Sequence, residues 1–291
     1  NLRQTPTQAD CRDQARQTNC FAALRYRIVH LLPLLLGGLA VLNPFIGLIL
    51  IMFYSSYGIR QSGFSPIRVL LLFLIFPLTS LFVMREIPGV QLMASDAIWA
   101  VGLVTVLFLH SLRTGKSLTT AFTLAAMLIV FYGFARCIVF GNYLTHANEQ
   151  AISDVTNRFP SIYQRQDMRF YVAVMRYLWP ASWTIPQLFS LFAGYILFHN
   201  LNGIRFKWRK ISFPKYLNFI ILAILPLYMV TELHQVFVNT LLTLLVLPAI
   251  QGFSLMVDWL AKLVSSRLIL ALLMLLLIPN YILISLLGFT D

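Results

Sequence analysis

The chain has 291 residues, of which 59% are hydrophobic and only 11% are charged, whereas soluble domains carry about 25% charged residues. This composition excludes a water-soluble fold and leaves no separate soluble domain of ordinary size. The net charge of +12 does not indicate nucleic acid, because the basic residues stand in short loops between apolar runs, as the positive-inside rule produces. We therefore expect one all-α, polytopic transmembrane bundle, with membrane lipids as its default partners.

About eight apolar runs divide the chain. A helix needs about 20 apolar residues to cross the hydrocarbon core of a membrane. The predicted segments cover residues 29–57, 67–84, 92–112, 117–141, 179–199, 216–231, 234–257 and 266–288. A basic N-terminal segment, 1–28, precedes them, so the chain divides into this segment and a single transmembrane domain, 29–291.

The first run, 29–57, is longer than one crossing requires and contains Asn43-Pro44. Proline removes a backbone donor and restricts the residue before it, so the run is either one kinked helix or two short helices in a hairpin. With a hairpin and a cytoplasmic N-terminus, the basic residues outside the membrane divide 16 to 5 in favour of the cytoplasm, whereas a single crossing divides them 10 to 11. The positive-inside rule therefore favours the hairpin.

The longest polar stretch, about 142–178, connects the fourth and fifth runs. Within it Phe170, Val174, Tyr177 and Leu178 recur at helical spacing, which predicts an amphipathic helix lying at the membrane surface with its apolar face down. This helix is either a linker packed on the bundle or a lid over a cavity that opens on that side.

Ionisable groups inside a membrane are costly, which makes them candidates for function. Arg136 in the fourth run is the deepest, and it either binds an anionic group of a ligand or extends to the surface near Gly141. His110 ends the third run. Glu232 and His234 stand in a tight turn between the sixth and seventh runs, as a solvated corner or as an acid–base pair.

Polar residues also interrupt the seventh run, where Asn239, Thr243 and Gln251 lie among Leu and Val. Asn239 and Thr243 are four residues apart and share a helix face. Such groups either hydrogen-bond to a neighbouring helix or line a cavity. Together with Arg136, these three residues are the candidate ligand-binding residues.

Motifs for catalysis and cofactors are missing from the sequence. Gly115-Lys116-Ser117 resembles the end of a phosphate-binding loop, but position 110, where that loop needs glycine, is His110. The sequence has no zinc-protease motif, no nucleophile elbow and no acidic cluster for a divalent metal. We therefore expect no cofactor, no metal site and no enzymatic activity.

The last third of the chain carries short motifs at the ends of apolar runs. They are Phe213-Pro214-Lys215-Tyr216-Leu217, Asn239, Gln251-Gly252-Phe253-Ser254-Leu255 and Leu287-Gly288-Phe289-Thr290-Asp291. With the Pro- and Gly-interrupted opening and Gly58-Ile59-Arg60, they make residues 29–291 resemble the YybS-like family, an uncharacterised group of polytopic bacterial membrane proteins. The resemblance implies a multi-pass protein of the bacterial inner (cytoplasmic) membrane.

The general appearance of that family is similar to the substrate-capturing membrane subunits of energy-coupling-factor vitamin importers. Those subunits bind a small molecule in a helical bundle and depend on separate ATPase subunits. The resemblance thus implies a non-enzymatic membrane subunit that binds a small molecule or ion and takes part in transport with other membrane or cytoplasmic subunits. The alternative is a structural or assembly subunit of a larger bacterial inner-membrane complex.

Overall fold

The computed structural model describes residues 31–58, 65–160, 166–201, 213–214, 216–264 and 266–289; the basic segment 1–28 lies outside them. Within these residues every element is a helix and none is a strand, which confirms the all-α bundle. By length and composition, five described helices are able to cross a membrane: Pro66–Val83, Gly89–Arg113, Leu118–Arg158, Asp167–Leu201 and Thr231–Leu263. The protein is therefore a multi-pass integral membrane protein.

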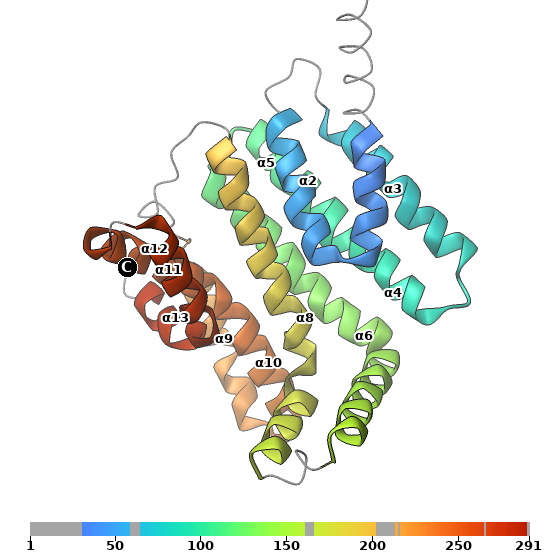
Figure 1. Ribbon diagram of the computed structural model, residues 1–291, viewed down its shortest axis with the longest axis vertical. Coiled ribbons are helices and arrows are strands. Elements are labelled where there is room, and N and C mark those ends of the chain that lie inside the picture. Colours follow the sequence, from blue (N-terminus) through green and yellow to red (C-terminus); the bar gives the residue numbers. More distant parts are fainter. Residues whose placement is uncertain are drawn as a thin grey trace, which may run out of the picture.

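The first apolar run is a helical hairpin with its break at Asn43. A short helix, Leu31–Leu42, ends there, and α2 (Pro44–Gly58) begins at the following proline. The Asn43 side-chain oxygen accepts hydrogen bonds from the backbone N–H groups of Phe45 and Ile46, both at 3.1 Å, and so caps α2. Figure 1 shows the two arms side by side at the N-terminal end of the bundle.

The second and third runs form α3 (Pro66–Val83) and a continuous helical crossing from Pro88 to Arg113. This crossing consists of α4 (Pro88–Asp96), a π-helical stretch η1 (Ala97–Leu103) and α5 (Val104–Arg113). Such π-helical turns widen the helix and are frequent at functional sites.

Two long helices, α6 (Leu118–Arg158) and α8 (Gln166–Leu201), form the centre of the fold. The separate surface helix expected within 142–178 is wrong, because 142–158 continue α6 and 166–178 belong to α8. No proline stands between Gly141 and Arg158 to end α6. At this far end a forked ion pair joins the two helices, with Arg176 Nη2 2.8 Å from Glu149 Oε2.

The sixth and eighth apolar runs are broken, so the expected count of about eight apolar segments is not confirmed. Residues 216–231 form α9 (Tyr216–Ala223) and a 3-10 turn (Leu225–Met229), and 266–288 form α12 (Arg267–Leu277), a 3-10 turn (Ile278–Asn280) and α13 (Tyr281–Phe289). Pro226 and Pro279 stand at these breaks, where they cannot continue an α-helix without losing a hydrogen bond. Between them lie α10 (His234–Leu244) and α11 (Val246–Leu263).

The hydrophobic core lies where α2, α5, α6 and α8 meet (Figure 1). Its centre includes aromatic side chains that meet edge to face, such as Phe108 and Phe198 at 5.2 Å between ring centres. A second packing unit joins α11 to α13, where any side chain on Gly252 or Gly288 would overlap the backbone of the facing helix. Small residues let helices in membranes approach closely in this way.

Candidate ligand pocket at Asp96 and Arg136

A buried ion pair joins the α4–η1 junction to the middle of α6. Arg136 Nε donates a hydrogen bond to Asp96 Oδ1 at 2.9 Å, and the two side chains are only 9% and 5% exposed. Arg136 was a candidate on sequence, whereas Asp96 was missed although it lies inside the run 92–112. A lone carboxylate in one apolar run and a lone guanidinium in another was the signal that would have paired them.

Tyr132 lies one turn before Arg136 on α6 and faces the same carboxylate. Its hydroxyl donates to Asp96 Oδ1 at 2.8 Å. Side chains four residues apart in a helix share a face, so α6 presents a hydroxyl and a guanidinium to one carboxylate oxygen. The carboxylate thereby receives two hydrogen bonds in a site where water is scarce, which offsets part of the cost of burying it.

The guanidinium is covered on its other side by α8. Arg136 Cζ lies 4.5 Å from the centre of the Trp183 ring, within the range of a cation–π contact. The close approach of α8 to α6 at this point depends on Gly133, because a side chain there would collide with Thr184, the neighbour of Trp183. Arg136 is therefore held between a carboxylate from α4 and an aromatic ring from α8.

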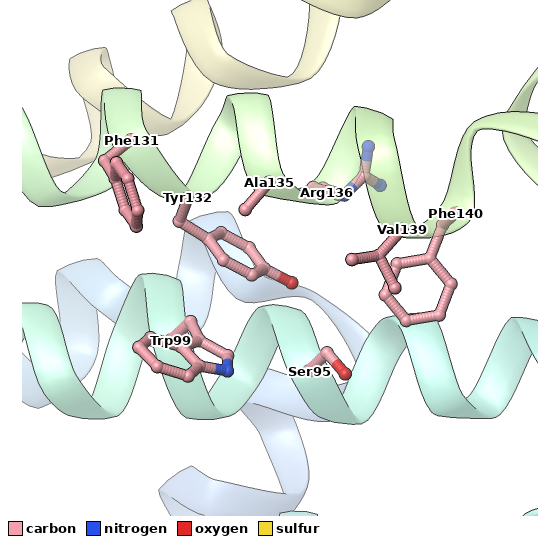
Figure 2. A pocket seen from close by; sticks show the side chains of 8 residues that line it. All are labelled: Ser95, Trp99, Phe131, Tyr132, Ala135, Arg136, Val139 and Phe140. Carbon is pink, nitrogen blue, oxygen red and sulfur yellow. The ribbon is translucent and has the colours of Figure 1, made fainter.

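Beside this ion pair the structure has a pocket of about 240 Å³. Figure 2 shows that its walls come from two facing helices, with Ser95, Trp99, Phe131, Tyr132, Ala135, Arg136, Val139 and Phe140 as its lining residues. Phe131 and Val139 are 68% and 71% exposed, so the pocket opens on the outer, lipid-facing surface of the bundle. Its walls are mostly apolar, and its polar groups gather at the end where Ser95 and Arg136 lie.

Counted along the helices, the ion pair lies almost one hydrocarbon thickness from the turn that joins α5 to α6. Arg136 is eighteen residues after the first residue of α6, which is about 27 Å at 1.5 Å per residue. Asp96 is seventeen residues before Arg113, the last residue of α5, or about 26 Å. Because the hydrocarbon core is about 30 Å thick, we expect both groups to lie near the membrane boundary opposite the short turn that joins α5 to α6.

The hydrogen-bond donors at the pocket are not all used. Within the described part of the chain, neither Nη atom of Arg136 has a hydrogen-bond partner, since its bond to Asp96 uses Nε. The Ser95 hydroxyl and the Trp99 ring nitrogen likewise donate to no other described residue. In Figure 2 the ring nitrogen of Trp99 points toward the Ser95 end of the pocket. Arg136, Ser95 and Trp99 thus place unused donors at the edge of a pocket whose exposed surface is nearly all apolar.

The other three candidate ligand-binding residues lie elsewhere, on α10 and α11. Asn239, Thr243 and Gln251 are 4%, 3% and 6% exposed, and none of them lines the Arg136 pocket. The Thr243 hydroxyl donates to the Asn239 carbonyl at 2.8 Å, and Gln251 Oε1 accepts from the Phe213 N–H at 3.2 Å. These two hydrogen bonds are to backbone, one within α10 and one from α11 to the segment before α9, which fits a structural role.

Asn239 supports α8 beside a proline. Its Oδ1 accepts from the Ala181 N–H at 3.0 Å, and its Nδ2 donates to the Tyr177 carbonyl at 2.9 Å. Ala181 and Tyr177 are the donor and acceptor of one helical turn, and this turn contains Pro180, which lacks an amide hydrogen and crowds the preceding turn. The Asn239 amide therefore supplies hydrogen bonds where the helix is weakened.

Gln187 on α8 is a further buried polar residue that the sequence analysis missed. Its Nε2 donates to the Ala100 carbonyl within η1 at 3.1 Å and reaches the Pro44 carbonyl at 3.5 Å. Its Oε1 has no hydrogen-bond partner in the described structure. The π-helical stretch next to Asp96 is thus fixed from α8 by a side-chain amide.

The remaining ionisable candidates do not form a site. His234 Nε2 lies 2.6 Å from the Tyr228 carbonyl and its ring stacks on Tyr228, while Glu232 contacts Thr231. His110 and Glu232 are exposed. Within the described ranges no group of three His, Cys, Asp or Glu side chains is placed to hold a metal ion.

The comparisons with known proteins return no relative. No protein-family model, no curated protein and no solved structure matches the chain. The resemblance to the YybS-like family therefore stays a prediction, and the chemistry of the pocket has to be inferred from its own residues.

Proposed function

We propose that this integral membrane protein is a non-enzymatic subunit that binds a small molecule in the Asp96–Arg136 pocket and takes part in transport. The observation that carries the proposal is a nine-tenths-buried guanidinium with unused donors at the wall of a cavity. Replacing a buried ion pair by apolar residues is often neutral or stabilising by about 1–4 kcal/mol. Since the pair is a poor device for stability, its place beside a cavity favours a binding role.

The form of the pocket supports the same conclusion. Small-molecule sites are concave and mostly apolar, with a few polar groups that orient the ligand. Here the polar groups are Arg136, Ser95 and Trp99, and the other lining side chains are largely apolar. A volume of 240 Å³ corresponds to about eight water-sized groups at ~30 Å³ each.

The position of the pocket favours entry of the ligand from the membrane or from its surface, because the opening faces lipid near one boundary of the hydrocarbon core. With the orientation that loop charge favours, this boundary is on the side away from the cytoplasm. The resemblance to the YybS-like family adds a bacterial inner-membrane location, a part in transport and separate partner subunits to the proposal.

Native mass spectrometry of the purified protein in lipid nanodiscs tests the proposal. We expect wild type to retain one small molecule, and Ala135→Phe to lose it because Ala135 lines the pocket and phenylalanine would fill it. Ile138→Phe is the matched control, since Ile138 lies on the same helix, is 84% exposed and is not among the lining residues. A wild-type protein that retains no small molecule, or equal retention by all three proteins, would count against the proposal.

A structural or assembly subunit is the second candidate. It is favoured by the described hydrogen bonds of Asn239, Thr243 and Gln251, which serve contacts within the fold, and by the apolar exposed face of α3, where Phe82 is 73% exposed. Extraction in a mild detergent followed by size-exclusion chromatography distinguishes the two. Stoichiometric partner chains that co-purify with wild type, but dissociate when an α3 surface residue such as Phe82 is replaced, would support the assembly role.

A further inference from the structure

We propose that the ligand of this pocket is an amphipathic anion, whose acid group binds Arg136 and whose apolar chain lies along the pocket wall, and that its binding takes up one proton. The inference rests on the proposed function and names the chemistry of the ligand. It also assigns Asp96 a role, as the group whose charge has to be compensated when the anion arrives.

The unused donors define the acid group. The two Nη atoms of Arg136 form a fork that matches a carboxylate or phosphate in geometry, and they have no partner among the residues that the structure describes. The Ser95 hydroxyl and the Trp99 ring nitrogen, which line the same pocket, add neutral donors. A cationic ligand would meet these donors and a guanidinium, whereas Asp96, the carboxylate that would attract it, is not among the lining residues.

The walls define the rest of the ligand. On both sides of Arg136, Phe131 and Ala135 before it and Val139 and Phe140 after it form an apolar surface along α6, open toward lipid. A chain of about eight non-hydrogen atoms fills the volume of 240 Å³, at ~30 Å³ for each water-sized group. Octanoate, with eight carbon and two oxygen atoms, is therefore close to the pocket in size and matches it in polarity and charge.

The charge balance requires the proton. Asp96 and Arg136 neutralise each other, so an added anion leaves one uncompensated negative charge in a buried site, and such a charge is costly. The titratable side chains that face Arg136 are Asp96 from α4 and Tyr132 and Cys137 from α6, whereas α8 contributes Trp183, which does not titrate. One proton shared by Asp96 and the ligand acid restores neutrality.

Proton uptake makes the affinity for the anion depend on pH. With one proton bound for each ligand, the apparent affinity rises about tenfold for each unit by which the pH falls. The Asp96→Asn variant removes the competing charge. In that variant the anion itself neutralises Arg136, so we expect binding that no longer depends on pH and is tighter than wild type at pH 8.

The experiment uses bromo-octanoate to quench the fluorescence of Trp99, in nanodiscs of zwitterionic lipid between pH 6 and pH 8, with Ala135→Phe to define the unspecific signal. Octanoate, octanol and octylammonium then compete for the site. We expect octanoate to compete at least about tenfold better than octanol, as for a charge-assisted pair, octylammonium not to compete, and octanoate binding to strengthen about tenfold per unit of falling pH.

Each outcome separates the two proposals. Saturable binding in which octanol equals octanoate would leave the pocket as a site but overturn its preference for an anion, and octanoate binding that ignores pH would overturn the proton uptake. No saturable signal from bromo-octanoate would overturn the amphipathic anion as the ligand, whereas the proposed function itself falls only if wild type also retains no small molecule in native mass spectrometry. Competition by added phosphatidylglycerol would identify a lipid headgroup, rather than a free acid, as the source of the anion.

Asp96→Asn leaves Arg136 unpaired and is the variant most at risk of not folding. Arg136→Lys is the second variant, because lysine keeps the charge beside Asp96 but lacks the fork of two donors. We expect it to bind octanoate at least about tenfold more weakly at every pH while octanol binding is unchanged. Unchanged octanoate binding in Arg136→Lys would remove the guanidinium from the ligand site.

Discussion

Removing one partner of the Asp96–Arg136 pair should cost much more than removing both. Asp96→Asn keeps the shape of the side chain but leaves the nine-tenths-buried Arg136 without a counter-charge. Breaking a buried pair in this way costs about 3–5 kcal/mol. The contact with Trp183 is present in wild type and variant alike, so it does not offset the loss.

Arg136→Met should cost a similar amount, because Asp96 would keep only the Tyr132 hydroxyl. The double variant Asp96→Asn, Arg136→Met removes both charges, and its free energy of unfolding should lie near that of wild type. A double-mutant cycle measured by steric trapping or by unfolding in mixed micelles gives these values. Glu149→Gln is the matched control, since the Glu149–Arg176 pair is 44–52% exposed and should contribute no more than about 1 kcal/mol.

The reasoning would be refuted by single variants that each lose less than 1 kcal/mol, a threshold set by the usual size of an exposed pair. It would also be refuted by a double variant whose loss equals the sum of the two single losses. Either result would mean that the two charges are solvated independently, and that the pocket is wetter than its burial indicates.

Two further changes test how α6, α8 and α10 are held together. Gly133→Ala should lower the free energy of unfolding by about 1–3 kcal/mol because the added methyl overlaps α8. Gly141→Ala is the control in the same helix, and it should stabilise the protein by up to about 1 kcal/mol because no atom lies within 4 Å of the added methyl. Equal effects of the two changes on thermal unfolding would contradict this reasoning. Asn239→Ala should cost about 1–3 kcal/mol and Thr240→Val clearly less, since the Thr240 hydroxyl bonds only to its own helix among described residues. Adding Pro180→Ala to Asn239→Ala should recover part of the lost free energy of unfolding. If nothing is recovered, Asn239 does not support the turn that contains Pro180.

The all-α architecture follows from composition, and the break in the first run follows from Asn43-Pro44, because both depend on local chemistry. The lengths of the long helices were harder to predict. The fifth apolar run was placed from residue 179, after a polar stretch, yet α8 begins at Gln166 and continues through Pro180. Its turn at Pro180 is supported by Asn239, a residue fifty-eight positions later than the Ala181 it contacts. A contact at that separation cannot be derived from local spacing.

Only part of the candidate site was predicted from the sequence. Arg136 was identified from the cost of a charge in an apolar run, but its partner Asp96 lies forty positions earlier on another helix, and only the packing of α4 on α6 brings them together. Asn239, Thr243 and Gln251 were identified as polar groups in an apolar run, and the structure places them apart from the pocket. Polarity within a run thus indicates burial with partners, while the nature of the partner depends on tertiary packing.

The most direct test of the binding role is an experimental map at side-chain resolution of the protein purified in native lipid. The account predicts non-protein density in the pocket within about 3 Å of an Arg136 Nη atom, with its body along Phe131 and Val139. A pocket closed by the protein's own side chains, or an Arg136 turned away from Asp96 toward the aqueous surface, would contradict it.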